Sequence, residues 1–226
     1  MRIIKPGFVI EDEINGLEVL KKIERAGRTC YKSEAKITED SCREFVKKII
    51  ASGHHSVLEH EKVTARVICD RGVTHEIVRH RIASYSQEST RYCNYGKDGF
   101  GAEITVISPI EAFWTDAGQR ETEDAPLSGD DRKYYIWREA MAAAEKAYLE
   151  LIRLGASPQE ARSVLPNSLK TEIVMTMNLR EWRHFFTLRT SKAAHPQMRE
   201  IASYMLSEFK HLIPVVFDDI CAWEQA

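Results

Sequence analysis

Residues 79–91 form a run of unusual composition near the middle of this 226-residue chain. They read Arg-His-Arg-Ile-Ala-Ser-Tyr-Ser-Gln-Glu-Ser-Thr-Arg, with three arginines, one histidine and three serines. Neither the apolar stripe of a packed helix nor the alternation of a half-buried strand has this composition. Arginine offers a planar fork of donors to phosphate and imide oxygens, and serine hydroxyls and backbone N–H groups complete such sites. The run therefore predicts a pocket for an anionic ligand with a flat polar ring.

The overall charge indicates that these arginines act locally. The chain has 32 Lys and Arg against 34 Asp and Glu, a net charge of −2, whereas a general nucleic-acid binder needs a strongly basic surface. No apolar run approaches the ~20 residues that span a membrane, and the N-terminus lacks the apolar stretch of a signal peptide. The cysteines are scattered, odd in number and form no Cys-x-x-Cys: Cys30, Cys42, Cys69, Cys93 and Cys221. This usage favours a reducing cytoplasm over a disulfide framework.

Hydrophobic periodicity predicts a single α+β domain over residues 1–226, with helices packed on an antiparallel or mixed sheet. Strands are expected at residues 1–11, 61–69, 103–108 and around Ile173–Met177. Helices are expected at residues 15–27, from Thr38 to Gly53, and at 73–80, 131–154, 180–190 and 196–212. Another helix should start at Ser157-Pro158-Gln159-Glu160, which has the form of a capping box. No Gly-x-Gly-x-x-Gly is present, which argues against a Rossmann fold.

Three local expectations are specific enough to check. Asp70-Arg71-Gly72 should turn the chain before the helix at 73–80, one side of which would carry His75, Glu76 and Arg79. Residues 112–131 are acidic, contain glycine and proline, and predict a long exposed loop. The helix at 131–154 should bury the stripe Ile136, Ala140, Ala144, Tyr148, Leu151 and Ile152.

The spacing within the arginine run resembles the signature of the flavin-dependent thymidylate synthases. The matching positions are Arg79, His80, Arg81, Ser84, Ser89 and Arg91. The resemblance continues in three further segments: residues 54–60, the Arg-Ser-Val-Leu-Pro run at 162–166, and Asn178-Leu179-Arg180 followed by Leu188-Arg189. Together these segments cover about residues 50–200 in the order of the family.

The resemblance implies a non-Rossmann flavoprotein that methylates dUMP to dTMP, with FAD as cofactor and NADPH and methylenetetrahydrofolate as co-substrates. It also implies a homotetramer with shared active sites. The FAD contacts that it implies are His54, Ser56, Arg79, His80, Arg81, Gln87, Asn178, Arg180 and His184. The dUMP contacts are Glu76, Arg79, Gln87, Glu88, Ser89, Arg91, Arg162 and Arg189. Glu76 and His184 depart from the glutamine and asparagine common in the family.

Chemistry assigns roles within these sets. Arg91, Arg162 and the serine loop suit the phosphate of dUMP, and Arg189 is the expected catalytic residue, stabilising negative charge on the uracil ring. No cysteine belongs to the signature, so Cys69 and Cys93 are expected to be inert thiols. Ser89 has cationic neighbours rather than a base, which favours a hydrogen-bonding role over a nucleophilic one.

Other interpretations of the same residues remain open. His55, Glu59 and His60 miss the spacing of a metal-binding His-x-x-Glu-His by one residue, and no metal site is expected. Arg180, His184 and Thr187 share a helix face that periodicity alone would leave to solvent. A flavin reductase acting on another pyrimidine or a folate is the second enzyme class, and an RNA-binding module is the alternative outside enzymes.

Overall fold

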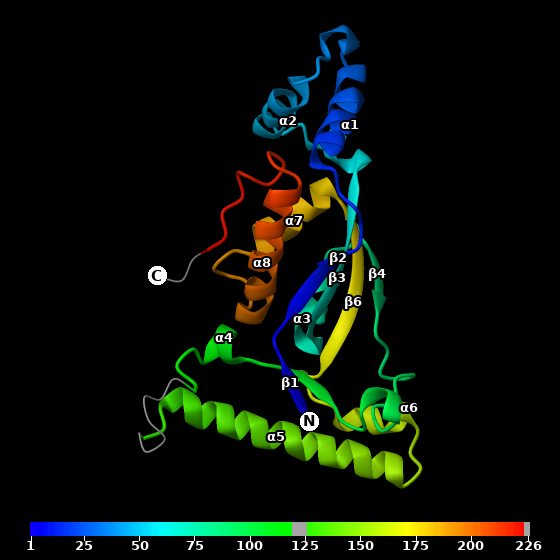
Figure 1. Ribbon diagram of the computed structural model, residues 1–226, viewed down its shortest axis with the longest axis vertical. Helices are drawn as coiled ribbons and strands as arrows, with labels where there is room; N and C mark the ends of the chain where they lie inside the picture. Colours follow the sequence, from blue (N-terminus) through cyan, green and yellow to red (C-terminus); the bar gives the residue numbers. More distant parts are fainter. Residues whose placement is uncertain (119–125, 224–226) are drawn as a thin grey trace. The chain divides into compact units, whose positions relative to one another are not determined.

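The computed structural model describes residues 1–118 and 126–223 (Figure 1). The chain divides into two compact units, each built from three segments. The first unit comprises Met1–Gly7, Val67–Ile77 and Ser86–Ile173, and the second comprises Phe8–Arg66, Val78–Tyr85 and the residues from Val174 onward. None of the helices in the described ranges is long and apolar enough to cross a membrane.

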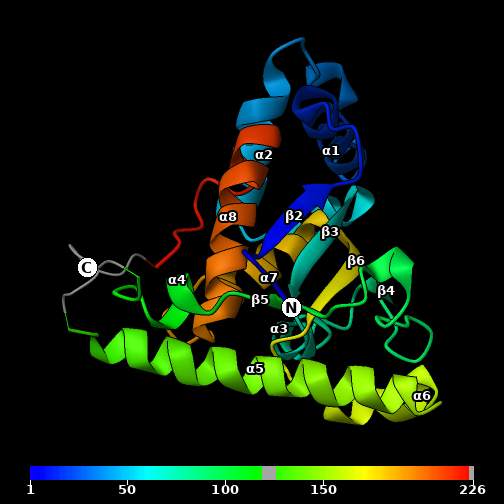
Figure 2. The ribbon, with the colours of Figure 1, turned by 60° about the horizontal axis from the view of Figure 1, so that its bottom comes forward.

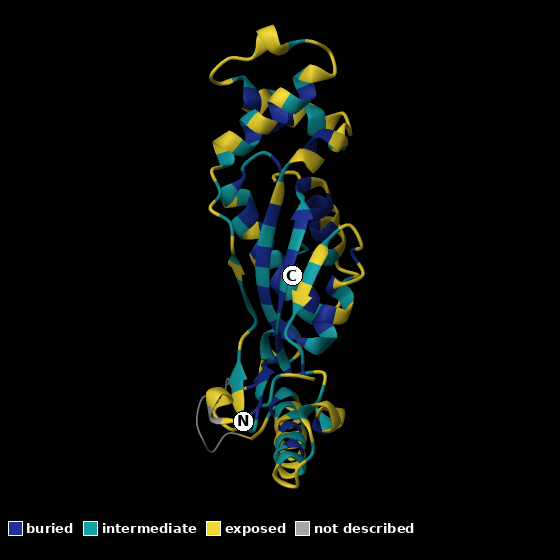
Figure 3. Cartoon of the chain, turned by 90° about the vertical axis from the view of Figure 1, so that its right-hand side faces the viewer, coloured by how far each residue is buried: buried dark blue, intermediate teal, exposed yellow. Residues whose placement is uncertain are grey.

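A four-stranded sheet has the strand order β2-β3-β6-β4, with β2 at Gly7–Ile10, β3 at Lys62–Asp70, β6 at Lys170–Asn178 and β4 at Ser84–Gln87. β3 and β6 run antiparallel, because Leu179 N donates to Glu61 O beyond one end and Arg71 N donates to Leu169 O beyond the other. Burial alternates along both strands, as Figure 3 shows, and every second side chain is buried. The strands predicted from this alternation are therefore confirmed, together with the α+β class.

The second unit holds helices α1 (Gly16–Thr29), α2 (Ser41–Ala51), α7 (Leu179–Arg189) and α8 (Pro196–Leu212), and the short 3-10 helices η1 (Glu34–Lys36) and η2 (His55–His60). α1 packs against α2, while α7 packs against α8 and η2. The Asn15 side chain accepts hydrogen bonds from Leu17 N and Glu18 N, which caps α1. A buried aromatic cluster forms the core between α7, α8 and the following segment: Trp182, Phe185, Phe186, Phe209 and Phe217.

The first unit holds strands β1 (Arg2–Ile4) and β5 (Thr105–Ile107), which pair in parallel. Its helices are α3 (Arg71–Ile77), α4 (Ile110–Phe113), the 25-residue α5 (Gly129–Arg153) and α6 (Pro158–Ala161), with the 3-10 helices η3 (Asp98–Phe100) and η4 (Arg162–Val164). α6 contacts α5 near the C-terminal end of α5 (Figure 2). The predicted capping box at Ser157 and Glu160 is confirmed.

The predicted core stripe of α5 is wrong in its N-terminal half. Ile136 is 72% exposed and Ala140 is exposed, whereas Met141 and Tyr148 are buried. Trp137 explains the difference, because its Nε1 donates to Ser168 Oγ and its ring packs on the core of the first unit. One residue corresponds to about 100° around a helix, so burying Trp137 turns Ile136 outward. Ala144, Leu151 and Ile152 are half-buried, as the stripe requires.

Three boundaries differ from the sequence expectations. Residues 1–11 form two strands, β1 and β2, separated at Lys5-Pro6. α3 begins directly at Arg71 rather than after a turn, because Asp70 Oδ1 accepts a hydrogen bond from Val73 N and acts as a helix cap. α3 also ends at Ile77, so Arg79 does not share a helix face with His75 and Glu76.

The loop predicted at 112–131 loses residues at both ends to helices. Helix α4 extends to Phe113, and helix α5 begins at Gly129. Residues 119–125 of that prediction lie outside the described residues. Helix α2 starts at Ser41 rather than at Thr38, where the sequence predicted it. The Ser41 hydroxyl accepts a hydrogen bond from Thr38 N, and the chain turns between these two residues.

Candidate active site

Helix α7 presents two faces of opposite character, as its periodicity predicts. The Asn178 side chain accepts from Glu181 N at 2.9 Å and caps the helix at its start. Trp182, Phe185 and Phe186 are buried, and the Trp182 indole donates to Val63 O at 3.0 Å. These contacts fix the rotation of the helix, and Arg180, His184 and Thr187 consequently lie exposed on the other side.

A cavity of about 520 Å³ opens on this exposed face of α7, within the second unit. Its volume falls in the range of roughly 300–1,000 Å³ that is typical of small-molecule sites. The lining residues come from η2, the end of β6, α7 and the arginine run: His55, Glu59, Ile82, Asn178, Arg180, Glu181, Arg183, His184 and Thr187. Three residues of the expected flavin set therefore line one cavity. His54 and Ser56, also of that set, lie exposed at the start of η2, which packs against α7.

An exposed ion pair joins two residues of this cavity, with Arg180 Nη1 2.6 Å from Glu59 Oε1. Both side chains are about half exposed, at 54% and 44%. An ion pair in such a setting contributes about 0–1 kcal/mol, so an anionic ligand can displace Glu59 at little cost. Glu59 and His55, which the sequence analysis weighed as metal ligands, both have protein partners. Glu59 pairs with Arg180, and His55 Nε2 lies 3.4 Å from Ile50 O.

His80 is buried in the middle of a chain of hydrogen bonds between Glu181 and Arg189. Its Nδ1 lies 2.9 Å from Glu181 Oε1, and Arg189 Nε donates to its Nε2 at 3.1 Å. Burial lowers the pKa of His80 below its ordinary value, and the positive charge of Arg189 adds to that effect while Glu181 opposes it. One donor atom each from His80, Glu181 and His184 lies within 4.8 Å of the others, a spacing that a metal ion could use. Arg189 brings a fixed positive charge to the same ring, which disfavours a cation there.

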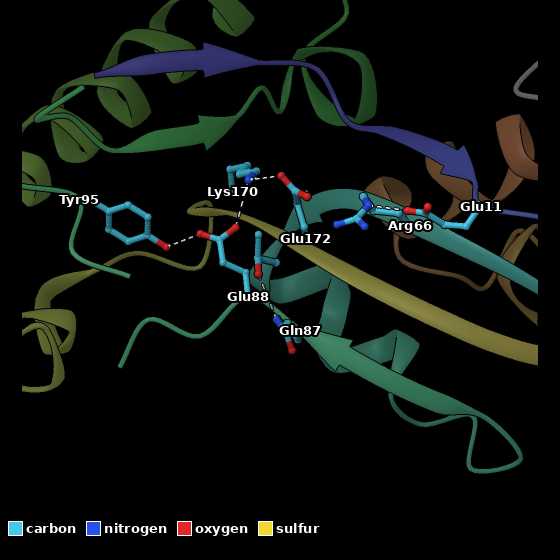
Figure 4. Close-up of polar contacts among 8 residues, drawn as sticks. Glu11, Arg66, Gln87, Glu88, Tyr95, Lys170 and Glu172 are labelled. Carbon is cyan, nitrogen blue, oxygen red and sulfur yellow. Dashed lines mark hydrogen bonds and ion pairs between the residues drawn. The ribbon is translucent and has the colours of Figure 1, made fainter. Parts of the chain in front are cut away.

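The second half of the arginine run is anchored in the first unit. Gln87 Nε2 donates to the hydroxyls of Thr74 and Thr171 at 3.1 and 3.3 Å. The Glu88 carboxylate accepts from Tyr95 at 2.7 Å and from Lys170 at 3.0 Å, as Figure 4 shows. Burial, and then the Glu88 carboxylate, raise the pKa of Tyr95 well above its ordinary value, so Tyr95 remains a donor to Glu88. These contacts fix the chain just before the last residues of the signature.

Helix α6 lies beside two of the predicted cations, since it bonds Arg91 and is followed in the chain by Arg162. Arg91 Nε donates to Gln159 Oε1 on α6 at 3.0 Å, and its guanidinium lies 5.5 Å from the centre of the Tyr92 ring. Arg162 directly follows α6 and is exposed. Ser89 Oγ accepts from Arg91 N at 3.4 Å. Arg91, Arg162 and Ser89 all belong to the first unit, and guanidinium groups and serine hydroxyls are groups that bind anions in proteins.

Most of the predicted FAD contacts lie in one unit, and most of the predicted dUMP contacts lie in the other. Of the expected flavin contacts, all lie in the second unit except Gln87. Of the expected dUMP contacts, all lie in the first unit except Arg79 and Arg189. Glu76 is half-buried on α3, and Arg79 and Arg81 are exposed.

Sequence reasoning missed four residues that hold the predicted site residues within their own units: Glu181 in the second unit, and Gln159, Tyr95 and Lys170 in the first. Glu181 stands three residues after Asn178, where an acidic residue also suits the positive end of any helix. Gln159 stands inside a capping box, and Lys170 is the first residue of an alternating strand. The local sequence therefore explains these residues without a ligand site. Their contacts with His80, Arg91 and Glu88 appear only in the folded chain.

Comparisons with known proteins agree with the motifs. The family described as thymidylate synthase complementing protein matches residues 15–215. The flavin-dependent thymidylate synthase of Pyrococcus abyssi is 36% identical over 185 residues, which cover 80% of this chain and 69% of the relative. That of Geobacter sulfurreducens is 35% identical over 201 residues, covering 86% and 78%.

A solved structure supports the fold. The UMP/dUMP methylase PolB from Streptomyces cacaoi, bound with 5-bromo-dUMP, superposes with a TM-score of 0.76 at 22% identity and 96% coverage of both chains. Its complex with 5-bromo-UMP gives a TM-score of 0.74, with 96% and 95% of the two chains covered. The match in sequence spans nearly all the described elements, and the chain therefore belongs to the thymidylate synthase complementing protein family, whose curated members include flavin-dependent thymidylate synthases.

Proposed function

We propose that this protein is a flavin-dependent thymidylate synthase, which methylates dUMP to dTMP with methylenetetrahydrofolate as the carbon donor and NADPH as the reductant of FAD. One observation carries the proposal: the family match over residues 15–215 contains every segment of the signature and every residue around the cavity. The activity is that of the curated relatives at 35–36% identity.

The cavity on α7 supports FAD binding in the second unit. Asn178, Arg180 and His184 offer an amide, a guanidinium and an imidazole to one space, which suits the phosphates and the polar ring edge of a flavin nucleotide. His54, Ser56, Arg79, His80, Arg81 and Gln87 complete the proposed set. Bound flavin supplies the reducing equivalents. We propose that it binds without a Rossmann fold, since the cavity lies beside a helix that follows an antiparallel strand.

The anion-binding side chains of the first unit support dUMP binding. Ser89, Arg91 and Arg162 hold the phosphate in this proposal, and Gln87 and Glu88 fix the loop through their buried contacts. Arg189 is the proposed catalytic residue, stabilising negative charge as the uracil imide ionises and electron density rises at C5. Glu76 and Arg79 complete the proposed dUMP contacts.

The cysteines are not nucleophiles in this proposal, and replacing all five with Ser or Ala should leave substantial turnover. Burial raises the pKa of Cys69 and, with Glu88, that of Cys93, so neither is a thiolate at neutral pH. Turnover is compared with the FAD content and the circular dichroism of the same preparation. Loss of activity in Cys69→Ala or Cys93→Ala alone, with fold and FAD binding intact, would contradict the flavin-only chemistry.

We propose that the two units act together as one catalytic domain and that the enzyme works as a cytoplasmic homotetramer with shared active sites. FAD, a nucleotide and a folate are large beside a 25.9 kDa chain, and symmetric copies create clefts that one copy lacks. Light scattering at assay concentrations should give about four times the chain mass. A fully active monomer would refute the shared sites.

The proposed function is tested by a turnover assay. The pure protein is incubated with FAD, NADPH, methylenetetrahydrofolate and dUMP deuterated at C5, and dTMP formation and deuterium release are followed. Reductant consumption with no dTMP would instead indicate a flavin reductase acting on another acceptor. Failure to bind FAD at micromolar concentrations, together with RNA binding, would indicate a nucleic-acid-binding module.

A further inference from the structure

Three side chains of the second unit form a continuous hydrogen-bonded chain from Glu181 through His80 to Arg189. The two bonds measure 2.9 and 3.1 Å. His80 is 4% exposed and Glu181 is 8% exposed, so water competes little for either bond. Phe185 packs edge-on against the His80 ring with centroids 5.0 Å apart, and the Tyr85 hydroxyl donates to the His80 carbonyl. The imidazole is therefore held in one orientation.

The identity of the donors fixes the tautomer of His80. A guanidinium only donates hydrogen bonds, so the Nε2 atom that faces Arg189 must be the acceptor. The remaining ring proton of a neutral imidazole then lies on Nδ1, facing the Glu181 carboxylate. Burial keeps the pKa of His80 below its ordinary value, so the neutral form prevails at neutral pH. A carboxylate at Nδ1 is a common way in which proteins select this tautomer.

This arrangement determines how the Arg189 guanidinium lies. The group is planar, so a hydrogen bond donated by Nε restricts the plane in which both terminal nitrogens lie. Arg189 is the last residue of α7, where a long side chain otherwise has considerable rotamer freedom. The hydrogen bond that Arg189 donates to a buried, rigid acceptor removes part of that freedom before any ligand arrives.

We propose that Glu181 and His80 are positioning residues for Arg189: Glu181 selects the His80 tautomer, and His80 orients the guanidinium for the uracil ring. The inference rests on the proposed function, in which Arg189 stabilises charge on that ring. It gives His80 a role besides its place in the flavin set, and it gives Glu181 a role that helix capping does not explain.

The test is a double-mutant cycle on the full-length, FAD-loaded enzyme, with kcat, KM for dUMP, the calorimetric Kd for dUMP and the melting temperature measured for each variant. Glu181→Ala and His80→Phe are each expected to lower kcat by about tenfold to a hundredfold, the size of loss that misplacement of a catalytic group produces. The double variant should fall within about twofold of the worse single variant, because Glu181 acts through His80. KM and Kd should change by less than about threefold, since the loss belongs to the transition state.

Conservative variants separate positioning from stability. His80→Gln can still accept from Arg189 Nε through its amide oxygen, and should retain more turnover than His80→Phe. Glu181→Gln should likewise retain more than Glu181→Ala. Glu24→Ala is the matched control, because Glu24 is a helical carboxylate only 1% exposed that bonds Arg28 and Ser41 in the same unit. This control should lower the melting temperature and leave kcat unchanged.

Additive losses across the cycle, or wild-type kcat in Glu181→Ala, would overturn the positioning role and leave the proposed function standing. If the disruptive variants do not fold, His80→Asn decides, because its shorter amide reaches the place of Nδ1 but leaves Arg189 Nε without its acceptor: wild-type kcat would overturn the inference, and a loss at unchanged melting temperature that His80→Gln does not share would support it. Absence of dTMP formation by the wild-type enzyme would refute the proposed function itself.

Discussion

Arg189→Ala is expected to lower turnover of dUMP by on the order of 10²-fold or more, the loss seen when one donor to a developing negative charge is removed. The guanidinium ends helix α7 and is held by His80 at its Nε. FAD binding should change little, because the cavity on α7 is lined by other residues. Single-turnover kinetics with dUMP, alongside an FAD titration, measure both effects.

A matched variant excludes a simple helix-end effect. Arg153 lies in the last turn of α5, as Arg189 lies in the last turn of α7, and it is 69% exposed. A cation at a helix C-terminus contributes about 0.3–1 kcal/mol to stability through the helix dipole. Arg153→Ala should therefore reproduce that small loss without affecting turnover. Near wild-type turnover in Arg189→Ala would rule out its catalytic role.

Trp182→Ala should destabilise the protein by about 3–5 kcal/mol, the usual cost of removing a fully buried aromatic side chain. Trp182 is 0% exposed, and its ring lies 4.7 Å from that of Phe209 and 5.5 Å from those of Phe185 and Phe186. The variant also loses the hydrogen bond that the indole donates to the Val63 carbonyl. Urea unfolding at one fixed protein concentration measures the change in free energy.

Tyr31→Ala provides the comparison, since Tyr31 is 74% exposed and its loss should change stability by no more than about 0.5 kcal/mol. A loss below about 1 kcal/mol in Trp182→Ala would contradict the view that this ring anchors α7. Because α7 carries Arg180, His184 and Arg189, a destabilised variant should also lose FAD at a lower temperature than the wild-type enzyme.

Helices and strands in which apolar residues recur at a regular spacing were predictable from the sequence. The alternation along β3 and β6 and the two faces of α7 were confirmed residue by residue, because burial decides both. The N-terminal half of α5 was not predictable in the same way. There the apolar Ile136 and the aromatic Trp137 compete for the core, and the partner Ser168 that favours Trp137 lies far along the chain.

The candidate site shows the same limit. The motif residues were recognised because their spacing is unusual, but their partners were not. Glu181, Gln159 and Tyr95 become significant only when the fold brings them to His80, Arg91 and Glu88. The ligand contacts expected from the resemblance remain predictions, which the proposed assays and variants are designed to test.

The way in which the chain alternates between its two units bears on recombination between relatives. Each unit is assembled from three separate stretches of sequence, and β2, β3, β4 and β6 each carry residues of both units. A single genetic crossover between two family members therefore produces a chimaera in which at least one unit mixes residues from both parents. Exchanging a whole unit intact would need breakpoints inside these four strands and directly after α3, and within the strands backbone pairing and burial alternation must match. Productive chimaeras should consequently arise from parents that share their strand residues, whatever the differences in their surface loops.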